Sequence, residues 1–196
     1  MVNRLQQEKA QLRKQSLEKR DALAIDERIE KSLRAAEYGA EHIEFDPGTI
    51  VSGFFPIRTE IDPRPLMDEL RKKSARLCLP VVIDKTTIVF RELVRGAELI
   101  DTGFGTRGPD ENAEILDPLV MIMPLSVFDH YGGRIGYGAG HYDRAITKLI
   151  DKDIKPRLIG MGFDCQHVEQ VPVEPHDQPL SAMVTESGFY PARQQS

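Results

Sequence analysis

The segment 119–150, LVMIMPLSVFDHYGGRIGYGAGHYDRAITKLI, decides the fold of this chain. It begins with the apolar run LVMIM (119–123), which ends at Pro124 and suits a strand buried on both faces of a sheet. It ends with a predicted helix over 142–150, in which Tyr142, Ile146 and Leu149 share one side. A buried strand, a glycine-rich loop and a helix in this order indicate an α/β layer fold.

The rest of the chain fits the same fold class. Residues 3–45 contain no proline and only Gly39, so they are predicted to be helical, with Asp26 as the N-cap of a second helix. The other predicted elements are a strand at 49–55, a helix at 62–74, a hairpin of strands at 76–82 and 87–93, a loop at 96–114, and strands at 158–163 and 183–186. We expect a single three-layer α/β domain over residues 1–196, with a mostly parallel or mixed central sheet and helices on both faces.

Composition excludes several classes of protein. The 196 residues are 40% hydrophobic and 29% charged, as in an ordinary globular domain. Trp is absent, aromatic residues make up 7% and the net charge is −5, so we expect no surface for nucleic acid. Cys78 and Cys165 form no C-x-x-C pair and predict reduced, buried thiols, with a catalytic thiol as the alternative.

The chain shows no membrane or export signal. No apolar run approaches the roughly 20 residues that span a bilayer. The N-terminal residues lack the apolar core of a signal peptide. We therefore expect a cytoplasmic protein, a monomer, that binds small molecules and neither nucleic acid nor a membrane.

The N-terminal segment is basic, whereas the body is acidic. Residues 1–20 carry a net charge of +4, which leaves −9 on the remaining 176 residues. On the first helix, Leu5, Leu12 and Leu23 predict a core-facing stripe. Three basic residues lie on the flank of that stripe: Lys9, Arg13 and Arg20. Their heads either converge on a cleft or form a solvated basic face. The second helix repeats apolar residues at 29, 33, 36 and 40.

The loop of segment 119–150 carries the chemistry. Five of the nine residues 132–140 are glycine, so backbone N–H groups can approach a ligand closely. The following helix adds its N-terminal N–H groups, and Arg134 and Arg144 add positive charge. We interpret this as a phosphate-binding loop; a plain surface loop is the alternative. The chain has no Walker motif, and its G-x-G-x-x-G match at 103–108 precedes Pro109 rather than a helix, which indicates a wide turn.

Two carboxylates could hold a metal near this loop. Asp143 directly follows the glycines, and Asp177 lies in the irregular, proline-rich segment VPVEPHDQPL (171–180). One or two carboxylates together with substrate phosphates suit Mg²⁺. Each Asp taken alone is more often a cap or a turn residue. The five histidines show no zinc-binding spacing.

Four segments together resemble the 5-formyltetrahydrofolate cyclo-ligases. The segment MPLSVFDHYGGRIGYGAGHYDRAI (123–146) is similar to the family's signature. Lys9-x-x-Leu-Arg13 with Arg20 resembles its basic first helix, and FFPIRTEID (54–62) resembles its strand-to-Glu segment. The C-terminal residues Gln166, Val171-Pro172, His176-Asp177 and Val184-Thr185-Glu186 resemble its last block.

The resemblance implies an ATP- and Mg²⁺-dependent enzyme that converts 5-formyltetrahydrofolate to 5,10-methenyltetrahydrofolate and releases ADP and phosphate. It implies a basic N-terminal helix, about residues 3–24, that completes the nucleotide site. The catalytic residues would be Arg134, Arg144 and Tyr137. ATP would contact Lys9, Arg13, Arg134, Ile135, Gly136, Tyr137, Gly138, Ala139, Gly140, His141 and Tyr142. The folate would contact Arg13, Phe55, Glu60, Tyr137, Gly138, Ala139, Gly140 and His141, and the metal would be held by Asp143 and Asp177.

The chain departs from the family pattern at three positions. It has His141 where relatives usually have an aromatic residue, Ala139 where many have Lys, and Gly108 where the family tends to have Glu or Gln. Two other functions stay open. One is a non-catalytic relative that binds folate or associates with RNA, and the other is a sugar-phosphate isomerase or transferase on a similar scaffold, which would not consume ATP.

Overall fold

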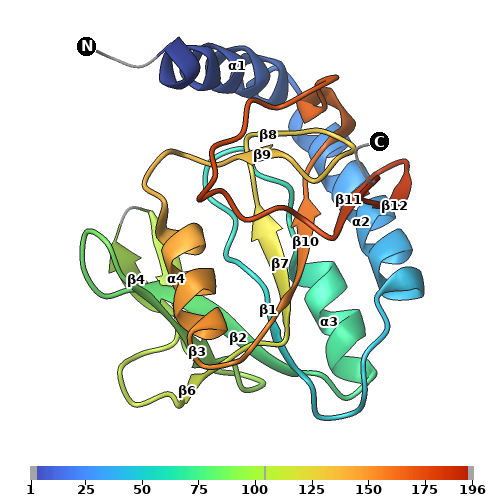
Figure 1. Ribbon diagram of the computed structural model, residues 1–196. Coiled ribbons are helices and arrows are strands. Elements are labelled where there is room, and N and C mark those ends of the chain that lie inside the picture. Colours follow the sequence, from blue (N-terminus) through green and yellow to red (C-terminus); the bar gives the residue numbers. More distant parts are fainter. Residues whose placement is uncertain (1–3, 104, 194–196) are drawn as a thin grey trace.

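An eight-stranded mixed sheet runs through the middle of the protein (Figure 1). The computed structural model describes residues 4–103 and 105–193. The strand order is β12-β11-β10-β7-β1-β2-β3-β6. Five neighbouring strands from β11 to β2 are parallel, and antiparallel strands close both edges. The prediction of a mostly parallel or mixed sheet is confirmed.

The bounds of the strands are as follows. In the large sheet they are β1 (Ile50–Ser52), β2 (Arg76–Val82), β3 (Ile88–Glu92), β6 (Ile115–Leu116), β7 (Val120–Pro124), β10 (Arg157–Met161), β11 (Ala182–Thr185) and β12 (Gly188–Pro191). Two small hairpins stand outside it: β4 (Ile100–Gly103) with β5 (Thr106–Gly108), and β8 (Val127–Phe128) with β9 (Arg134–Ile135).

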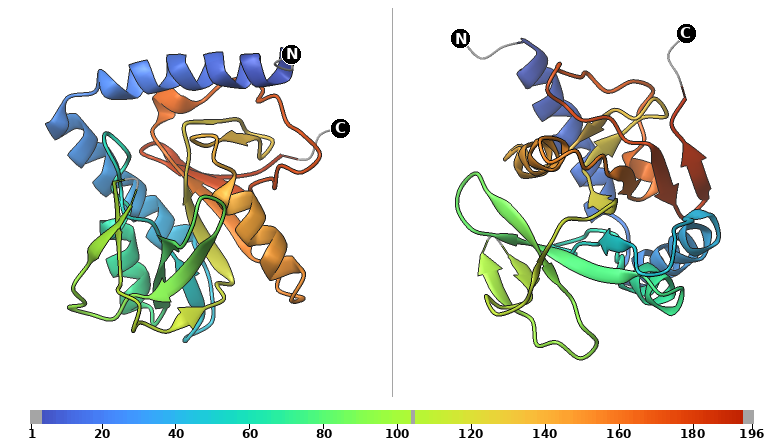
Figure 2. Two further views of the ribbon diagram at one scale, coloured as in Figure 1. Left: turned by 90° about the vertical axis from the view of Figure 1, so that its left-hand side faces the viewer. Right: turned by 60° about the horizontal axis from the view of Figure 1, so that its bottom comes forward.

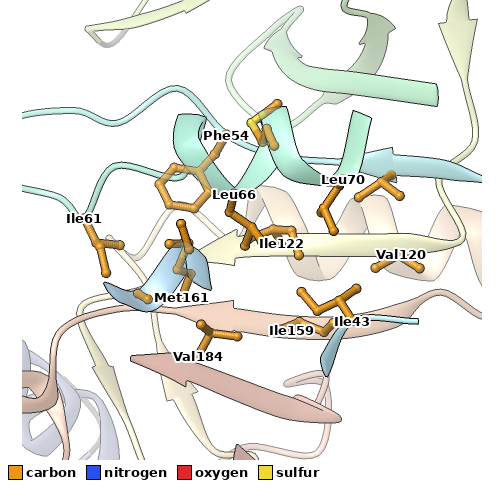
Figure 3. Packing of buried hydrophobic residues seen from close by; sticks show 14 of the residues in the cluster. Ile43, Phe54, Ile61, Leu66, Leu70, Val120, Ile122, Ile159, Met161 and Val184 are labelled. Atoms are coloured by element: carbon orange, nitrogen blue, oxygen red, sulfur yellow. The ribbon is translucent and has the colours of Figure 1, made fainter. Parts of the chain in front are cut away.

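Helices cover both faces of the sheet, as predicted. They are α1 (Arg4–Asp21), α2 (Ile25–His42), α3 (Arg64–Lys72), α4 (His141–Ile150) and the short 3₁₀ helix η1 (Asp164–Gln166). One apolar cluster packs α2 and α3 against one face; Figure 3 shows Leu66 and Leu70 of α3 over Ile122 and Ile159 of the sheet. A second cluster packs Ile146 and Leu149 of α4 against the other face. Within the described residues, no helix has both the length and the apolarity to cross a membrane.

The central strand β7 forms as its sequence predicts except at its start, because Leu119, the first residue of the predicted run, lies outside the strand and is 49% exposed. Val120, Met121, Ile122 and Met123 are all buried, because helices cover both faces at this point. The helix predicted at 142–150 is α4, which begins one residue earlier, at His141. The predicted 76–82 and 87–93 hairpin is the antiparallel pair β2 and β3.

The α2 helix departs from its sequence pattern. Ala24, not Asp26, is the N-cap, and Asp26 lies in the first turn, where its charge favours the helix N-terminus. The predicted apolar face is wrong at Ile29 and Leu33, which are 58% and 49% exposed. Small residues face the core instead, because α2 crosses α3 so closely that a Cβ on Gly39 would meet the Leu66 side chain at 2.9 Å.

Two other predictions need correction. The strand predicted at 49–55 spans only Ile50–Ser52, because the chain then leaves the sheet; Phe54 is buried in the core, and Pro56 has no N–H for a ladder. The segment 96–114 is no plain loop, since it contains β4 and β5. A polar side-chain contact joins its two strands, between the hydroxyls of Thr102 and Thr106 at 2.8 Å, and the segment shows no apolar alternation.

The two thiols are free, as predicted. Cys78 is buried, and burial raises the pKa of its thiol to about 12. Cys165 is only half-buried, contrary to the expectation that both are buried.

The α1 helix crosses the carboxyl ends of the parallel strands (Figures 1 and 2). Its predicted leucine stripe packs only partly: Leu12 and Leu23 are half-buried against the body, whereas the fully buried residues of α1 are Ser16 and Arg20. Strand order reverses between β1 and β7 below this helix. Ligands of open α/β sheets bind at such a reversal, outside the carboxyl ends of the strands.

Candidate functional site

A cavity of about 1020 Å³ lies between α1, the ends of β1, β2 and β7, and the start of α4. All of the site residues predicted from the sequence line it: Lys9, Arg13, Phe55, Glu60, Arg134, Ile135, Gly136, Tyr137, Gly138, Ala139, Gly140, His141, Tyr142, Asp143, Arg144 and Asp177. The basic heads of Lys9 and Arg13 therefore meet at a cleft, and the solvated-face alternative is wrong for both.

The glycine-rich loop, residues 132–140, is shaped by the arginines that pack on it. Gly138 has φ +98°, and a Cβ there would lie 3.4 Å from the Arg13 guanidinium. The same guanidinium donates from Nε to the Gly136 carbonyl at 2.6 Å. Gly140, with φ +65°, is the N-cap of α4, so this helix begins at the cavity wall, where its first N–H groups lack intrahelical partners. The loop thus supplies backbone donors and is pinned by α1.

Arg134 and Asp143 form an ion pair in the wall. Arg134 Nη2 lies 2.5 Å from Asp143 Oδ1, which also accepts from the Gln178 N–H at 3.2 Å. Arg134 Nε and the hydroxyl of Tyr142 are buried and have no partner in the described structure. Buried polar atoms are nearly always hydrogen-bonded, so two orphaned donors on one cavity wall are typical of a site whose ligand is polar.

Arg144 and His141 tie the start of α4 to the turn between β2 and β3. Arg144 donates from Nε to the Thr86 carbonyl at 2.8 Å and from NH2 to the Ala139 carbonyl at 2.5 Å. A ring nitrogen of His141 lies 3.0 Å from the Lys85 carbonyl. The sequence did not mark this turn as part of the site, although it brings Lys85 to the cavity wall.

Lys9 bridges α1 to the C-terminal segment. Its ammonium lies 2.5 Å from Asp177 Oδ2 and 3.0 Å from Glu174 Oε2. Burial alone would lower the pKa of Lys9, but the two carboxylates outweigh it and raise that pKa above its usual value. Burial in turn opposes the ionised form of Asp177, yet the Lys9 hydrogen bond and the Glu174 N–H hold the pKa of this carboxyl below its ordinary value.

The two predicted metal ligands keep oxygens for a cation. In the described structure, hydrogen bonds reach Asp143 through Oδ1 and Asp177 through Oδ2. Asp177 Oδ1 faces His176 Nε2 at 3.8 Å. Glu174, His176 and Asp177 have ligand atoms within 4.8 Å of one another, and Asp143 is not in this group. Free carboxylate oxygens suit a hard cation such as Mg²⁺, so the residues fit the metal that the sequence predicts.

Glu60 lies on the β1 side of the cavity. Its carboxylate accepts from the Ile57 N–H at 2.9 Å. Burial raises the pKa of Glu60 to about 7, against the opposing effects of this hydrogen bond, of Arg20, of Tyr137 and of Arg58. The site therefore holds a carboxyl group that changes charge near neutral pH.

A family model settles which proteins the chain is related to. The model of the 5-formyltetrahydrofolate cyclo-ligase family matches residues 5–186. The chain belongs to this family. It is 31% identical over 176 residues to the 5-formyltetrahydrofolate cyclo-ligase of Escherichia coli (strain K12). This match covers 87% of this chain and 96% of the relative. The relative of the same name from Mus musculus is 22% identical over 178 residues, or 84% of this chain and 87% of that one.

Solved structures agree with this family assignment. The 5,10-methenyltetrahydrofolate synthetase of Aquifex aeolicus is 30% identical and matches with a TM-score of 0.74, over 96% of this chain and 94% of that one. The synthetase of Mycoplasma pneumoniae, 22% identical, matches with a TM-score of 0.72 over 91% and 98% of the two chains and shares the fold.

In this cyclo-ligase family member, sequence analysis missed the residue that organises the loop. Asp129 is buried and follows β8. Its Oδ1 accepts from the N–H groups of Tyr131 and Gly133, each at 2.8 Å, and its Oδ2 accepts from Val171 N–H at 2.7 Å. Asp129 precedes one of these loop N–H groups by two residues and the other by four, and this spacing is the local signal that could have indicated its role. Other cavity residues without a sequence signal are Arg58, Pro80, Lys85, Arg107 and Glu174.

Proposed function

We propose that the protein converts 5-formyltetrahydrofolate to 5,10-methenyltetrahydrofolate with hydrolysis of ATP to ADP and phosphate. The charge of the cavity is the observation that carries the proposal. Seven Lys and Arg side chains line it against four Asp and Glu, in a chain whose net charge is −5. A cavity this basic in an acidic protein attracts anionic ligands. At about 1020 Å³ it also lies at the upper end of small-molecule sites, which suits two ligands side by side.

The chemistry requires an activated formyl oxygen. Nitrogen N5 donates into the formyl carbonyl, so N10 cannot displace that oxygen directly. Attack of the formyl oxygen on the γ-phosphorus breaks the bond to ADP and leaves an N5 iminium phosphate. N10 then attacks the iminium carbon, the carbon–oxygen bond breaks, phosphate leaves, and N10 loses its proton. No side-chain nucleophile is needed, so catalysis consists of positioning and charge stabilisation.

The phosphate side of the cavity would be formed by α1 and the glycine-rich loop. We assign Lys9, Arg13 and Arg134 to the phosphates of ATP, together with the backbone from 135 to 142, so that α1 completes the nucleotide site. Arg134 and Arg144, with Tyr137, would stabilise the charge that develops during transfer. Asp143 and Asp177 would hold Mg²⁺, which when bound supplies further positive charge to the phosphates.

The folate side would be formed by the segment after β1. We assign Phe55 and Glu60 to the folate, opposite the loop residues 137–141. Phe55 offers an apolar face for the ring system, and Glu60 offers carboxylate oxygens to its N–H groups. Arg13, at the boundary, would contact both substrates.

The direct test is to mix the protein with Mg·ATP and 5-formyltetrahydrofolate and follow the conjugated methenyl product by absorbance. We expect product only when nucleotide is present, with one ADP formed per methenyl group. Product formation without nucleotide, or binding of both substrates without any product, would overturn the proposal. In the latter case the non-catalytic alternative would hold.

A further inference from the structure

Arg20 of α1 is a buried arginine behind the cavity wall. It is 1% exposed and does not itself line the cavity. Its Nε donates to Thr59 Oγ1 at 3.0 Å, and its Nη2 donates to the Tyr137 hydroxyl at 2.8 Å. One guanidinium thus joins α1 to two segments that are 39 and 117 residues away in sequence.

The packing around Arg20 does not require a charged side chain. No carboxylate lies within ion-pair distance of it among residues 4–103 and 105–193. Its Nη1 is buried and has no hydrogen-bond partner there. A buried guanidinium in this state costs free energy, and an apolar side chain of similar volume would often serve the fold as well or better. We therefore attribute the buried charge at this position to the binding site beside it and not to packing.

The groups that Arg20 contacts connect it to Glu60. Tyr137 and Thr59 both accept hydrogen bonds from Arg20, and Thr59 directly precedes Glu60 in the chain. Tyr137 is also among the groups that hold down the pKa of Glu60. The guanidinium carbons of Arg20 and Arg58 each lie 5.9 Å from the centre of the Tyr137 ring. Arg20 from α1, Arg58 from the segment of Glu60 itself and Tyr137 from the loop all oppose the rise in the pKa of Glu60. The charge of Glu60 in turn helps to raise the pKa of Tyr142 in α4.

We propose that Arg20 is a positioning residue for the folate side of the cavity: it fixes the Tyr137 hydroxyl and supplies the positive charge that faces the Glu60 carboxylate. This inference rests on the proposed function, because it takes Glu60 and Tyr137 as folate contacts. Arg20 acts through these two residues and touches no substrate itself.

Removal of this charge has a defined consequence. Burial already raises the pKa of Glu60 to about 7, and Arg20 is among the groups that oppose the rise. Without Arg20 the pKa of Glu60 rises further, so less of the carboxylate is ionised at pH 7. A weaker acceptor for the folate N–H groups follows, and it recovers at higher pH. The ATP phosphates, bound by other residues, are unaffected.

The test compares Arg20→Gln, which removes the charge, with Arg20→Lys, which keeps it. Lys14→Gln is the matched control, because Lys14 lies on the same helix and its side chain is 78% exposed. For each variant, KM for 5-formyltetrahydrofolate and KM for ATP are measured from pH 6 to 9, and folate binding without ATP is measured by calorimetry.

For Arg20→Gln we expect KM for the folate to rise about fivefold at pH 7, with the midpoint of its pH profile about one pH unit higher, since a nearby opposite charge moves a carboxyl titration by this much or more. KM for ATP stays within twofold. Arg20→Lys restores the midpoint, and Lys14→Gln matches the unmodified protein. If Arg20→Gln does not fold, Tyr137→Phe, which removes only the hydroxyl, must move the midpoint in the same direction.

Two results overturn the inference. One is a pH profile for Arg20→Gln, or for Tyr137→Phe if it is the variant used, that superimposes on that of the unmodified protein. The other is an equal rise of both KM values, which is the mark of a purely structural role. If the unmodified protein forms no methenyl product, the proposed function fails and this inference fails with it. If it forms product and Arg20→Gln behaves identically, only this inference fails.

Discussion

Glu60 makes the stability of the protein depend on pH, and Glu60→Gln removes that dependence. The carboxyl has an ordinary pKa of 4.5 in the unfolded chain and a pKa of about 7 in the folded one, because burial disfavours its charged form. Between these values the unfolded chain releases the proton first. Folding is therefore favoured at low pH, and stability is lost as the pH rises through this window.

The size of the effect follows from the two pKa values. Their separation corresponds to roughly 3 kcal/mol in the free energy of unfolding, of which about 1 kcal/mol is already lost at pH 5. Between pH 5 and pH 8.5 the unmodified protein should thus lose about 2.5 kcal/mol relative to Glu60→Gln, in which residue 60 does not titrate. Glu18→Gln, an exposed change on α1, serves as the control and should show no such trend.

The assay is urea unfolding at the two pH values, followed by circular dichroism because the chain has no Trp. The quantity to compare is the difference in unfolding free energy between the unmodified protein and Glu60→Gln, since other titrating groups cancel in it. A difference that is the same at pH 5 and pH 8.5 would refute the burial argument for Glu60.

Three further changes test the site. Asp143→Asn should abolish turnover, because it removes the predicted metal ligand and leaves the buried Arg134 unpaired; near-normal kcat in a folded variant would contradict the metal role. Lys9→Ala should raise KM for ATP about tenfold and change KM for the folate little, and steady-state kinetics with each substrate varied would detect an equal change in both. Asp129→Asn should lower the unfolding free energy by roughly 2–3 kcal/mol, because an amide cannot accept all three backbone N–H groups; a denaturation midpoint equal to that of the unmodified protein would show that these bonds contribute nothing.

The elements predicted correctly are those in which local pattern and tertiary burial agree. The run at 119–123 is apolar on both sides of the strand, and both sides are covered in β7. The predicted burial of residues 29 and 33 in α2 was wrong, because apolar spacing shows only which residues share a face of the helix. The close crossing with α3 buries the face that carries small residues instead. The polar β4–β5 hairpin has no apolar alternation from which it could be predicted.

The residues of the candidate site could be predicted where they are consecutive in the sequence, and their roles could not be predicted where they depend on contacts between distant segments. The glycine-rich loop, with Arg134 and Asp143, forms one continuous segment, so its chemistry can be predicted from the sequence alone. The roles of Arg20 and Asp129 depend on contacts with Tyr137 and Val171, which are distant in the chain. Such contacts arise only from the folded topology.

The ion pair between Lys9 and Asp177 joins positions 168 residues apart. During synthesis on the ribosome, α1 is made long before residues 174–177, so Lys9 must wait for that segment before it finds its counter-charges. A polypeptide that stalls before residue 174 could already have β7 and α4 but would lack both of these carboxylates. Newly made molecules therefore complete this site only after the segment that carries Glu174 and Asp177 has been synthesised.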